Sequence, residues 1–508
     1  MLRRSDLSSL EMSEISERIS KLSSAQLELL SRRLFENRQR QVDQHVIRRR
    51  VRRDTPAVLS FPQQRMWILH QLEPTSSALN TSAAVRLRGP LDVEALRRSL
   101  LEIVQRHEAL RTSFHLRDGE PVQIVHEMSE WKLPFLDLSM LSETRREEEL
   151  TVVAVREAER PFDLSHWPLF RTTLVKLGDE HHILQIVMHH VVCDGWSLGV
   201  LIGEVGVLYR AHVRREVSPL PELPLQYTDY AEWQREWLQS EAATRQVSYW
   251  KQQLSGLPPS LELPFDRERP AVPSYRGDTI TFELGAELSS SLKTLAVGDG
   301  ATVFMILLAA FKTLLNRYTS QPDIVVGTNI ANRNDSRLEN LIGCFVNNLA
   351  LRTDLSGNPT FRELLRRVRD ITLAAYANQE LPYEALLEAL RAEGRAATDQ
   401  LFEVMFVLQN NPMPPASLEG LEVSFVNIGT EAAAFDLILF MAESKDGLVG
   451  YLQYDSHLFD SSTVDRMVQR FRILLQQVIA NPDEPIGSFS FTTPEEMKAL
   501  TAGFNVAL

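Results

Sequence analysis

The chain has 508 residues, of which 44% are hydrophobic and 24% are charged, and its formal net charge is −13. This composition is typical of a globular protein of two or three domains or of one bilobed unit, and the acidic balance argues against nucleic acid as the main partner. The two cysteines indicate no disulfide framework, and the absence of an apolar signal segment indicates no secretion. No apolar run approaches the ~20 residues of a membrane span, so we expect a cytoplasmic protein.

The first 54 residues differ from the rest of the chain. Apolar residues recur at helical spacing between residues 12 and 34 and predict two helices. A basic run, "RRRVRRD", follows at residues 48–54. We expect this run to be a solvated linker, and the alternative is a docking surface for an acidic partner chain. Residues 1–54 are therefore predicted to form a helical extension and a linker outside the main fold.

Alternating helix and strand patterns begin near Leu59 and reach a proline-rich stretch at residues 218–225, which predicts a crossing between two lobes, 55–224 and 225–508. The predicted elements of the first lobe are a helix after Pro62, a helix over 92–110, a strand over 121–127, a hairpin over 169–190 that turns at 178–180, and a helix after Ser197.

The second lobe repeats this mixed style. Its predicted elements are strands over 278–284, 322–330, 401–410 and 448–459 and helices over 302–318, 361–379 and 462–482. Strands and helices alternate without a strict βαβ repeat. The sequence therefore predicts an α/β fold with a mixed (α+β) sheet in each lobe.

The segment "MHHVVCDGWS", residues 188–197, places two adjacent histidines at the end of a predicted strand. Adjacent side chains on a strand point to opposite faces, so His189 and His190 are poorly placed to bind one metal ion. The chain also has no Cys-x-x-Cys pair. We therefore expect no metal site, and the histidines either end a strand or take part in catalysis.

The catalytic interpretation accounts for more of these residues. At a strand end, the His190 imidazole can face a cleft and accept a proton from an amine or hydroxyl group, or orient that group. Asp194 can hold the local backbone or pair with an arginine. Gly195 gives the backbone freedom beside a substrate, and a helix beginning near Ser197 adds backbone donors. We expect direct transfer between two substrates rather than a covalent acyl-enzyme.

His189-His190-x-x-x-Asp194-Gly195 resembles the HHxxxDG signature of nonribosomal peptide synthetase condensation domains. Further segments resemble the other core motifs of this family, in the family order. They are "SFPQQRMWIL" (60–69), "RHEALRTSF" (106–114), "YTDYAEWQ" (227–234), "IGCFVNNLALR" (342–352), "NQELPYEALLEAL" (378–390) and "LFEVMFVLQN" (401–410).

This resemblance implies a V-shaped pseudo-dimer of two chloramphenicol-acetyltransferase-like lobes with a tunnel between them. It implies an acyltransferase that binds no cofactor of its own, acts as a monomer and works beside a downstream adenylation domain. Donor and acceptor carrier proteins would present thioesters on phosphopantetheine arms. The acceptor amine would attack the donor thioester to form an amide bond.

The resemblance also assigns residue roles. His190 is the key group, as general base or as an orienting group, while the role of its neighbour His189 is left open. Asp194 is expected to be structural, in a salt bridge with Arg276. Arg111 is expected to support the site, and Trp196 and Ser197 follow Gly195 as they do in peptide-bond-forming members.

Several related functions compete with this interpretation. A heterocyclization domain would replace the histidines with aspartates, and a plant-type acyl-CoA transferase would carry a DFGWG motif, which is absent. An epimerization domain shares HHxxxDG but differs after Gly195, and a non-catalytic recruiting domain usually has a degraded motif. The chain resembles the excised first domain of a synthetase. Two interpretations are therefore equally supported. One is a starter domain that takes a fatty acyl group from acyl-CoA, and the other is an elongation domain whose docking element would lie in residues 1–50.

Overall fold

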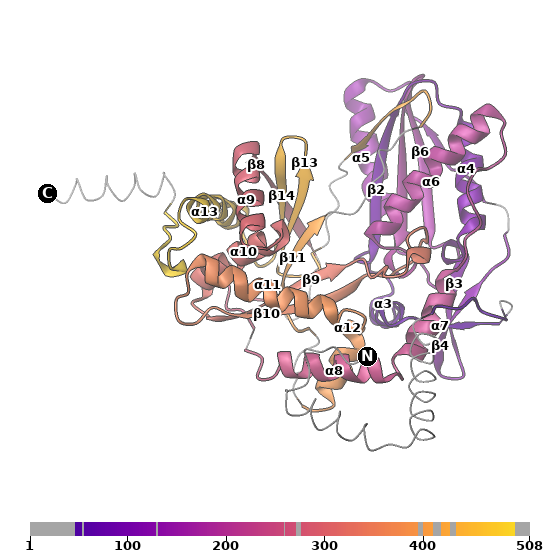
Figure 1. Cartoon of the computed structure of the whole chain (residues 1–508). Helices are drawn as coiled ribbons and strands as arrows, with labels where there is room; N and C mark the ends of the chain where they lie inside the picture. Colours follow the sequence, from indigo (N-terminus) through magenta and orange to yellow (C-terminus); the bar gives the residue numbers. More distant parts are fainter. Residues whose placement is uncertain are drawn as a thin grey trace, which may run out of the picture.

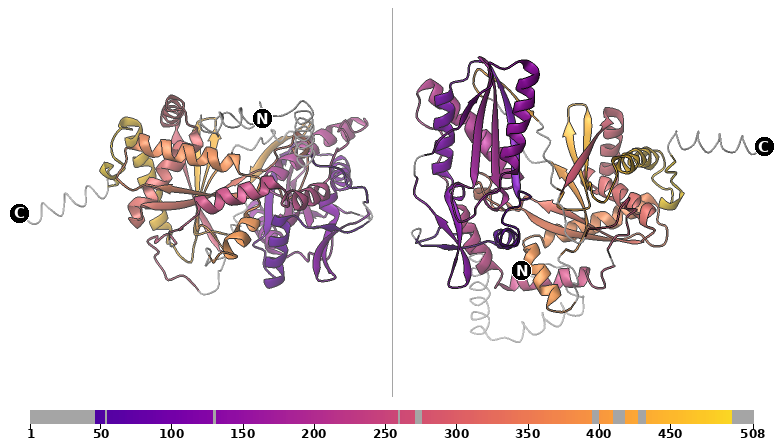
Figure 2. Two further views of the ribbon diagram at one scale, coloured as in Figure 1. Left: turned by 60° about the horizontal axis from the view of Figure 1, so that its bottom comes forward. Right: turned by 180° about the vertical axis from the view of Figure 1, so that it is seen from behind.

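Two lobes meet at their base in a computed structural model of the chain, and the V-shaped arrangement is visible from the front (Figure 1) and from behind (Figure 2). The structure describes residues 46–52, 55–128, 131–258, 260–270, 276–394, 400–409, 418–426 and 433–492. Each lobe contains a sheet with both parallel and antiparallel pairs, so the mixed α/β architecture predicted from the sequence is confirmed. The two helices predicted between residues 12 and 34 lie outside the described residues.

The N-terminal lobe is built on a five-stranded sheet in the order β12-β2-β7-β6-β5. Its strands are β2 (Asn80–Arg88), β5 (Phe135–Asp137), β6 (Phe170–Gly178), β7 (His181–His189) and β12 (Glu422–Val426). Helices α4 (Val93–Arg106) and α6 (Gly195–Arg214) share one apolar core with this sheet, and α5 (Glu143–Glu159) packs at another face. A small sheet of β1 (Ala57–Val58), β4 (Glu120–Val125) and β3 (Thr112–Arg117) lies near the base of the lobe.

Strand β7 is the strand that leads to the histidine pair, and both of its faces are buried. Leu184, Ile186 and Met188 belong to the core shared with α4 and α6, whereas Ile183 and Val187 belong to two other apolar clusters. This alternation follows from the two-residue period of a strand. A one-residue slip would move every side chain to the wrong face, so the pattern fixes where the strand ends.

The C-terminal lobe contains a six-stranded sheet in the order β10-β9-β11-β13-β14-β8. Its strands are β8 (Gly277–Gly285), β9 (Asp323–Ile330), β10 (Asn347–Asp354), β11 (Val404–Gln409), β13 (Leu437–Ser444) and β14 (Gly447–Asp455). Its helices are α9 (Ala286–Gly298), α10 (Val303–Thr319), α11 (Phe361–Ala377), α12 (Tyr383–Arg391) and α13 (Ser461–Ala480). Within the described chain, no single helix is long and apolar enough to cross a membrane; α9 and α10 pass that test only as a pair bent by 104°.

Three further helices lie at the base, where the lobes meet: α3 (Phe61–Leu72), α7 (Tyr227–Trp237) and α8 (Glu241–Gln253). Helix α3 begins with a capping box at Ser60 and has Pro62 in its first turn, so it starts slightly earlier than the predicted position after Pro62. The aromatic side chains of Tyr227 and Tyr230 on α7 pack against Phe345 from the C-terminal half. The Tyr227 hydroxyl also lies 2.7 Å from the Ser60 hydroxyl, so the proline-rich stretch leads into a helix that contacts both halves of the chain.

Strand β12 corrects the predicted lobe boundary. It lies in the 225–508 segment, but it pairs antiparallel with β2, from Glu422 opposite Arg88 to Val426 opposite Ala84. The C-terminal segment therefore supplies an edge strand to the N-terminal sheet. The division at residue 224 does not hold for this strand. By pairing with β2, it covers a sheet edge that would otherwise have unpaired backbone groups.

The segment 46–52 contacts α7 through Ile47 and Arg50, whereas Arg48, Arg49, Val51 and Arg52 are exposed. Ile47 is 2% exposed and joins an apolar cluster with Tyr227 and Tyr230. The Arg50 backbone N–H donates to the Asp229 carboxylate at 2.8 Å, and its guanidinium lies 2.6 Å from Glu232.

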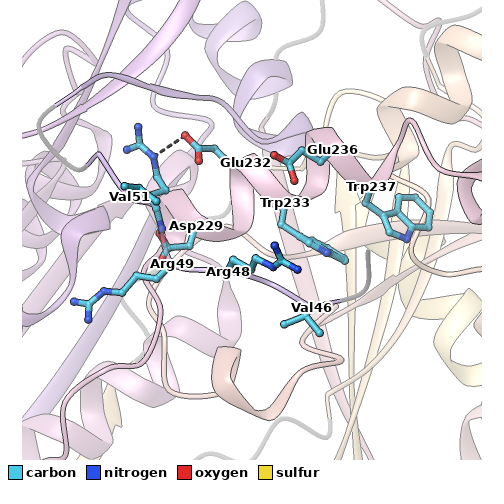
Figure 3. Close-up of a pocket in the computed structure, with 10 residues that line it drawn as sticks. Val46, Arg48, Arg49, Val51, Asp229, Glu232, Trp233, Glu236 and Trp237 are labelled. Carbon is cyan, nitrogen blue, oxygen red and sulfur yellow. Dashed lines mark hydrogen bonds and ion pairs between the residues drawn. The ribbon is translucent and has the colours of Figure 1, made fainter. Parts of the chain in front are cut away.

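A cavity of about 540 Å³ lies between this basic segment and the acidic and aromatic side chains of α7 (Figure 3). The residues that line it are Val46, Arg48, Arg49, Arg50, Val51, Asp229, Glu232, Trp233, Glu236 and Trp237. The basic run thus meets an acidic partner within its own chain.

Candidate active site

The histidine pair stands where a strand gives way to a short helical turn. Residues of β6 and β7 form the predicted hairpin, and β7 ends at His189. A 3-10 turn over His190–Val192 follows directly. This change of backbone places the two histidines in different surroundings, because His189 is 2% exposed whereas His190 is partly exposed.

His189 is buried and shapes the turn. Its Nδ1 accepts the backbone N–H of Val191 at 3.1 Å, and its ring meets the rings of His70 and Phe162 edge-on, with centroids 6.1 Å away in each case. Burial, with smaller contributions from His70, His190 and Arg171, lowers the pKa of His189 to about 3. His189 is therefore neutral at neutral pH and supports the turn on which His190 sits.

His190 is held by its backbone and presents its ring at the junction of the lobes. Its N–H donates to the carbonyl of Leu79 at 2.8 Å. Its Nδ1 lies 3.7 Å from the Sγ of Cys344, a residue of the C-terminal half. In the residues that the structure describes, no group of three His, Cys, Asp or Glu side chains is placed to hold a metal ion.

Asp194 caps the helix that follows. Its carboxylate accepts the Ser197 N–H at 2.8 Å and the Ser197 hydroxyl at 2.7 Å, and this side-chain cap starts α6 at Gly195. The prediction that this helix begins after Ser197 was therefore two residues late. Because Asp194 occupies the Ser197 N–H in the first turn of α6, this N–H group is not available to a substrate.

Asp194 also binds the loop 331–346, which connects β9 to β10 and reaches across to the N-terminal lobe. The Arg333 guanidinium lies 3.0 Å from the Asp194 carboxylate, and the Phe345 N–H donates to the same carboxylate at 3.0 Å. Arg333 also donates to the carbonyls of Leu338 and Leu341 at 2.6 and 2.8 Å. One buried ion pair therefore holds this loop closed and fixes it to the motif.

The salt-bridge partner predicted for Asp194, Arg276, was wrong. Arg276 is exposed and immediately precedes β8, and its carbonyl accepts the N–H of Ser456. Strand β8 is the edge of the C-terminal sheet opposite to β9 and β10, whereas the loop that reaches Asp194 connects β9 to β10. Topology therefore gives the role to Arg333.

The loop passes very close to the motif at Gly343. The Gly343 N–H donates to the Ser197 hydroxyl at 3.1 Å, and this hydroxyl oxygen also lies 2.9 Å from the Gly343 carbonyl oxygen. A Cβ on Gly343 would lie 2.0 Å from the Tyr227 ring, so only glycine fits. The Tyr227 hydroxyl in turn donates to the carbonyl of Cys344 at 2.6 Å.

The structure places the other predicted site residues around this junction. The Trp196 Nε1 donates to the Glu339 carbonyl at 2.8 Å and so joins α6 to the same loop. Arg111 ends a 3-10 turn, where its guanidinium donates to the carbonyl of His126 at 2.6 Å and lies 3.9 Å from Glu108. The structure therefore brings together five of the predicted residues: His190, Asp194, Gly195, Trp196 and Ser197. Arg111 is held separately, by His126 and Glu108.

Two residues of the site were missed from the sequence, Arg333 and Cys344. Cys344 lies inside the core-motif segment "IGCFVNN", and Arg333 lies in "ANRND", where the pattern predicts only a strand end and a loop. For Arg333, the sequence does offer one signal, namely a charged residue between a buried strand and a core motif. A partner 139 residues away in the sequence could not be chosen from that signal alone.

Comparisons with known proteins identify the family of this chain. The family described as "Condensation domain" matches residues 54–501. The chain is 45% identical over 458 residues to one of the linear gramicidin synthase proteins of Brevibacillus parabrevis, an alignment that covers 90% of this chain and 9% of that protein. It is 37% identical to the phosphinothricin tripeptide synthetase PhsC of Streptomyces viridochromogenes, over 96% of this chain and 45% of that protein. The chain thus spans less than half of the length of these relatives.

Among solved structures, the X-domain from teicoplanin biosynthesis superposes with a TM-score of 0.80 at 30% identity, over 88% of this chain and 99% of the X-domain. The first condensation domain of the calcium-dependent antibiotic synthetase superposes with a TM-score of 0.73 at 20% identity, over 86% of this chain and all of that domain, which shows the shared fold. The chain belongs to the condensation-domain family of nonribosomal peptide synthetases, the family that its core motifs predicted.

Proposed function

We propose that this domain is an acyltransferase that forms an amide bond between two thioester-bound substrates. One carrier protein would present a donor acyl or peptidyl group on phosphopantetheine, and a second would present an aminoacyl acceptor loaded by a downstream adenylation domain. The observation that carries this proposal is the different burial of the motif residues. His189 and Asp194 are enclosed in structural roles, whereas His190 is partly exposed where the two lobes meet.

In the proposed reaction, the acceptor amine nitrogen attacks the donor thioester carbonyl. A C–N bond forms, the C–S bond breaks, the amine loses a proton and the donor phosphopantetheine leaves as its thiol. His190 would act at this step on the amine or on the developing oxyanion. Asp194 and Gly195 would hold the turn that carries His190 against loop 331–346. Trp196, Ser197 and Arg333 would stabilise this contact.

The path to His190 is proposed to be a tunnel between the lobes, with the two carrier proteins at its opposite mouths. The acidic surface implied by a net charge of −13 agrees with a protein that does not bind nucleic acid. We propose that the domain acts as a monomer in the cytoplasm and holds no cofactor of its own. Arg111 would support the N-terminal lobe rather than act as a reacting group.

Two other functions are candidates for this fold. A starter domain would N-acylate the first amino acid from a fatty acyl-CoA, and a starter domain of rhizomide synthetase shares the fold at 19% identity. A non-catalytic recruiting domain is the second candidate, since a teicoplanin X-domain was solved in complex with OxyB and is 30% identical to this chain. The intact motif and the ordered contacts of His190 favour catalysis over recruitment.

The decisive experiment is intact-protein mass spectrometry with an aminoacyl carrier protein as acceptor. Octanoyl-CoA and a peptidyl carrier protein are offered in turn as donors. We expect amide transfer to the acceptor, and the donor that supports it distinguishes a starter from an elongation domain. Absence of transfer from both donors would favour the recruiting function.

The role of His190 is tested by His190→Ala in the same assay, in which transfer is expected to be abolished. The control is His166→Ala, because His166 is exposed and pairs only locally with Asp163. Turnover near the wild-type rate in His190→Ala would remove the proposed mechanism.

A further inference from the structure

In the described part of the chain, the His190 ring has one hydrogen-bond partner, and it is a thiol. Cys344 Sγ lies 3.7 Å from His190 Nδ1, a normal distance for a hydrogen bond that involves sulfur. The cysteine side chain is fully buried, and the Tyr227 hydroxyl fixes its backbone by donating to its carbonyl. Cys344 therefore meets the imidazole in a defined geometry.

The thiol has two acceptors within reach. Met66 Sδ lies 4.0 Å from Cys344 Sγ, farther than the imidazole nitrogen. A thioether is a weak acceptor, whereas an unprotonated imidazole nitrogen is a good one. Burial also keeps the pKa of Cys344 well above its usual value, so the sulfur keeps its hydrogen. The S–H group is thus expected to donate to His190 Nδ1.

We propose that Cys344 is a positioning residue that holds neutral His190 in the tautomer with its proton on Nε2. This inference deepens the proposed amide-forming function and rests on it. In this tautomer the ring offers a hydrogen-bond donor to the substrate and not a proton acceptor. His190 then stabilises the oxyanion that develops on the donor carbonyl, and the amine proton is released to another base or to water.

The neighbouring histidine has a comparable arrangement. His189 Nδ1 accepts a backbone N–H from Val191, so its ring proton also lies on Nε2. For His190 the equivalent donor is a side chain from the opposite half of the chain, 154 residues away. The tautomer of the catalytic ring would therefore depend on closure of loop 331–346 against the motif.

The test is ¹⁵N NMR of full-length protein labelled at histidine, with the His190 signals assigned by comparison with His190→Gln. In the wild type at a pH where His190 is neutral, we expect an unprotonated Nδ1 and a protonated Nε2. Cys344→Val should give a mixture of both tautomers, and Cys344→Ser should restore the wild-type pattern. If Cys344→Val does not fold, Cys344→Ala takes its place.

Cys193→Ala is the matched control. Cys193 is also fully buried, but its Sγ lies 3.5 Å from the His189 carbonyl and not from the His190 ring, so the His190 signals should stay unchanged. A wild-type spectrum with the proton on Nδ1, or an unchanged tautomer in Cys344→Val, would overturn the inference.

Kinetics supply a second readout. Loss of one neutral hydrogen bond should lower kcat by about two- to fivefold in Cys344→Val with KM unchanged, and Cys344→Ser should recover it. A change in KM alone would contradict a positioning role. The NMR result needs no turnover, so a wild-type domain that fails to condense substrates would refute the proposed function while leaving the tautomer assignment readable.

Discussion

The carboxylate of Asp194 lies 3.0 Å from the guanidinium of Arg333, and the two residues come from opposite halves of the chain. Both side chains are almost completely buried, at 4% and 1% exposed. The motif aspartate therefore acts as a joint between the lobes as well as a helix cap. The pair also explains why the turn with His190 and the loop with Cys344 lie against each other.

The first prediction concerns this joint. Asp194→Ala leaves the Arg333 guanidinium buried without its counter-charge, which should lower the free energy of unfolding by about 3–5 kcal/mol. The measurement is urea denaturation followed by tryptophan fluorescence. Arg333→Met should cost a similar amount, and the double variant should cost much less than the sum of the two.

The control for this prediction lies in the same loop. Asp335 pairs with Arg337 at 2.6 Å, but their side chains are 26% and 35% exposed, so Asp335→Ala should cost only about 1 kcal/mol. An Asp194→Ala variant as stable as Asp335→Ala would contradict the joint. If that variant were fully stable but inactive, Asp194 would have a direct chemical role.

The second prediction concerns the closest approach of the loop to the motif. Gly343→Ala would place a Cβ 2.0 Å from the Tyr227 ring, so the loop or the ring must move. We expect a loss of about 1–3 kcal/mol in unfolding free energy. We also expect amide formation to fall by about two- to fivefold, because His190 and Cys344 would separate. Thermal denaturation and the mass-spectrometric assay measure the two effects.

Gly298→Ala is the comparison for Gly343→Ala. A Cβ at Gly298 meets nothing within 4 Å, and the residue ends helix α9, so little change is expected in either measurement. Equal behaviour of the two variants would show that the loop is not tightly fitted at Gly343.

The third prediction concerns acid sensitivity. The pKa of His189 is lowered by burial to about 3, while an unfolded histidine has a pKa near about 6.5. Between these values the unfolded state binds more protons than the folded state, so stability falls as the pH falls from about 6.5. The contribution of this one group is about 1.4 kcal/mol per pH unit within that window.

His189→Asn removes the titration and keeps an acceptor for the Val191 N–H. The loss of stability between pH 7 and pH 5, measured by urea denaturation, should therefore be smaller in His189→Asn than in the wild type by about 2 kcal/mol. His166→Asn, at an exposed histidine, should behave as the wild type does. Identical pH dependence in all three proteins would rule out a buried neutral His189.

Much of the fold could be predicted from the sequence because its signals are local. The β6–β7 hairpin follows from alternating apolar residues and a tight turn, and α10 follows from its long apolar run. The start of α6 was placed two residues late because the capping side chain of Asp194 sits before the apolar pattern begins. Helices and strands could thus be predicted wherever the apolar pattern is periodic. Their ends could not be placed as well, because each end depends on a single side chain.

The contacts between the halves of the chain were not accessible in this way. The Asp194–Arg333 pair joins residues 139 positions apart, and an arginine in a loop carries no mark of its partner. The family resemblance supplied a candidate, Arg276, but that residue lies at the opposite edge of the C-terminal sheet. Similarly, β12 is a short strand whose exposed and partly exposed residues gave no sign that it would leave its own lobe.

The pairing of β12 with β2 has a consequence for movement and for engineering. Strand β12 connects the C-terminal segment to the N-terminal sheet. Any movement of the lobes apart must keep β12 paired with β2 or break the five residue pairs from Glu422 to Val426. The Arg214–Glu419 ion pair, at 2.7 Å, adds a second fastening beside it. Chimeras that join two condensation domains at the proline-rich crossing would separate β2 from its own edge strand. Exchange of the lobe together with β12 should give better-folded hybrids than exchange at the crossing alone.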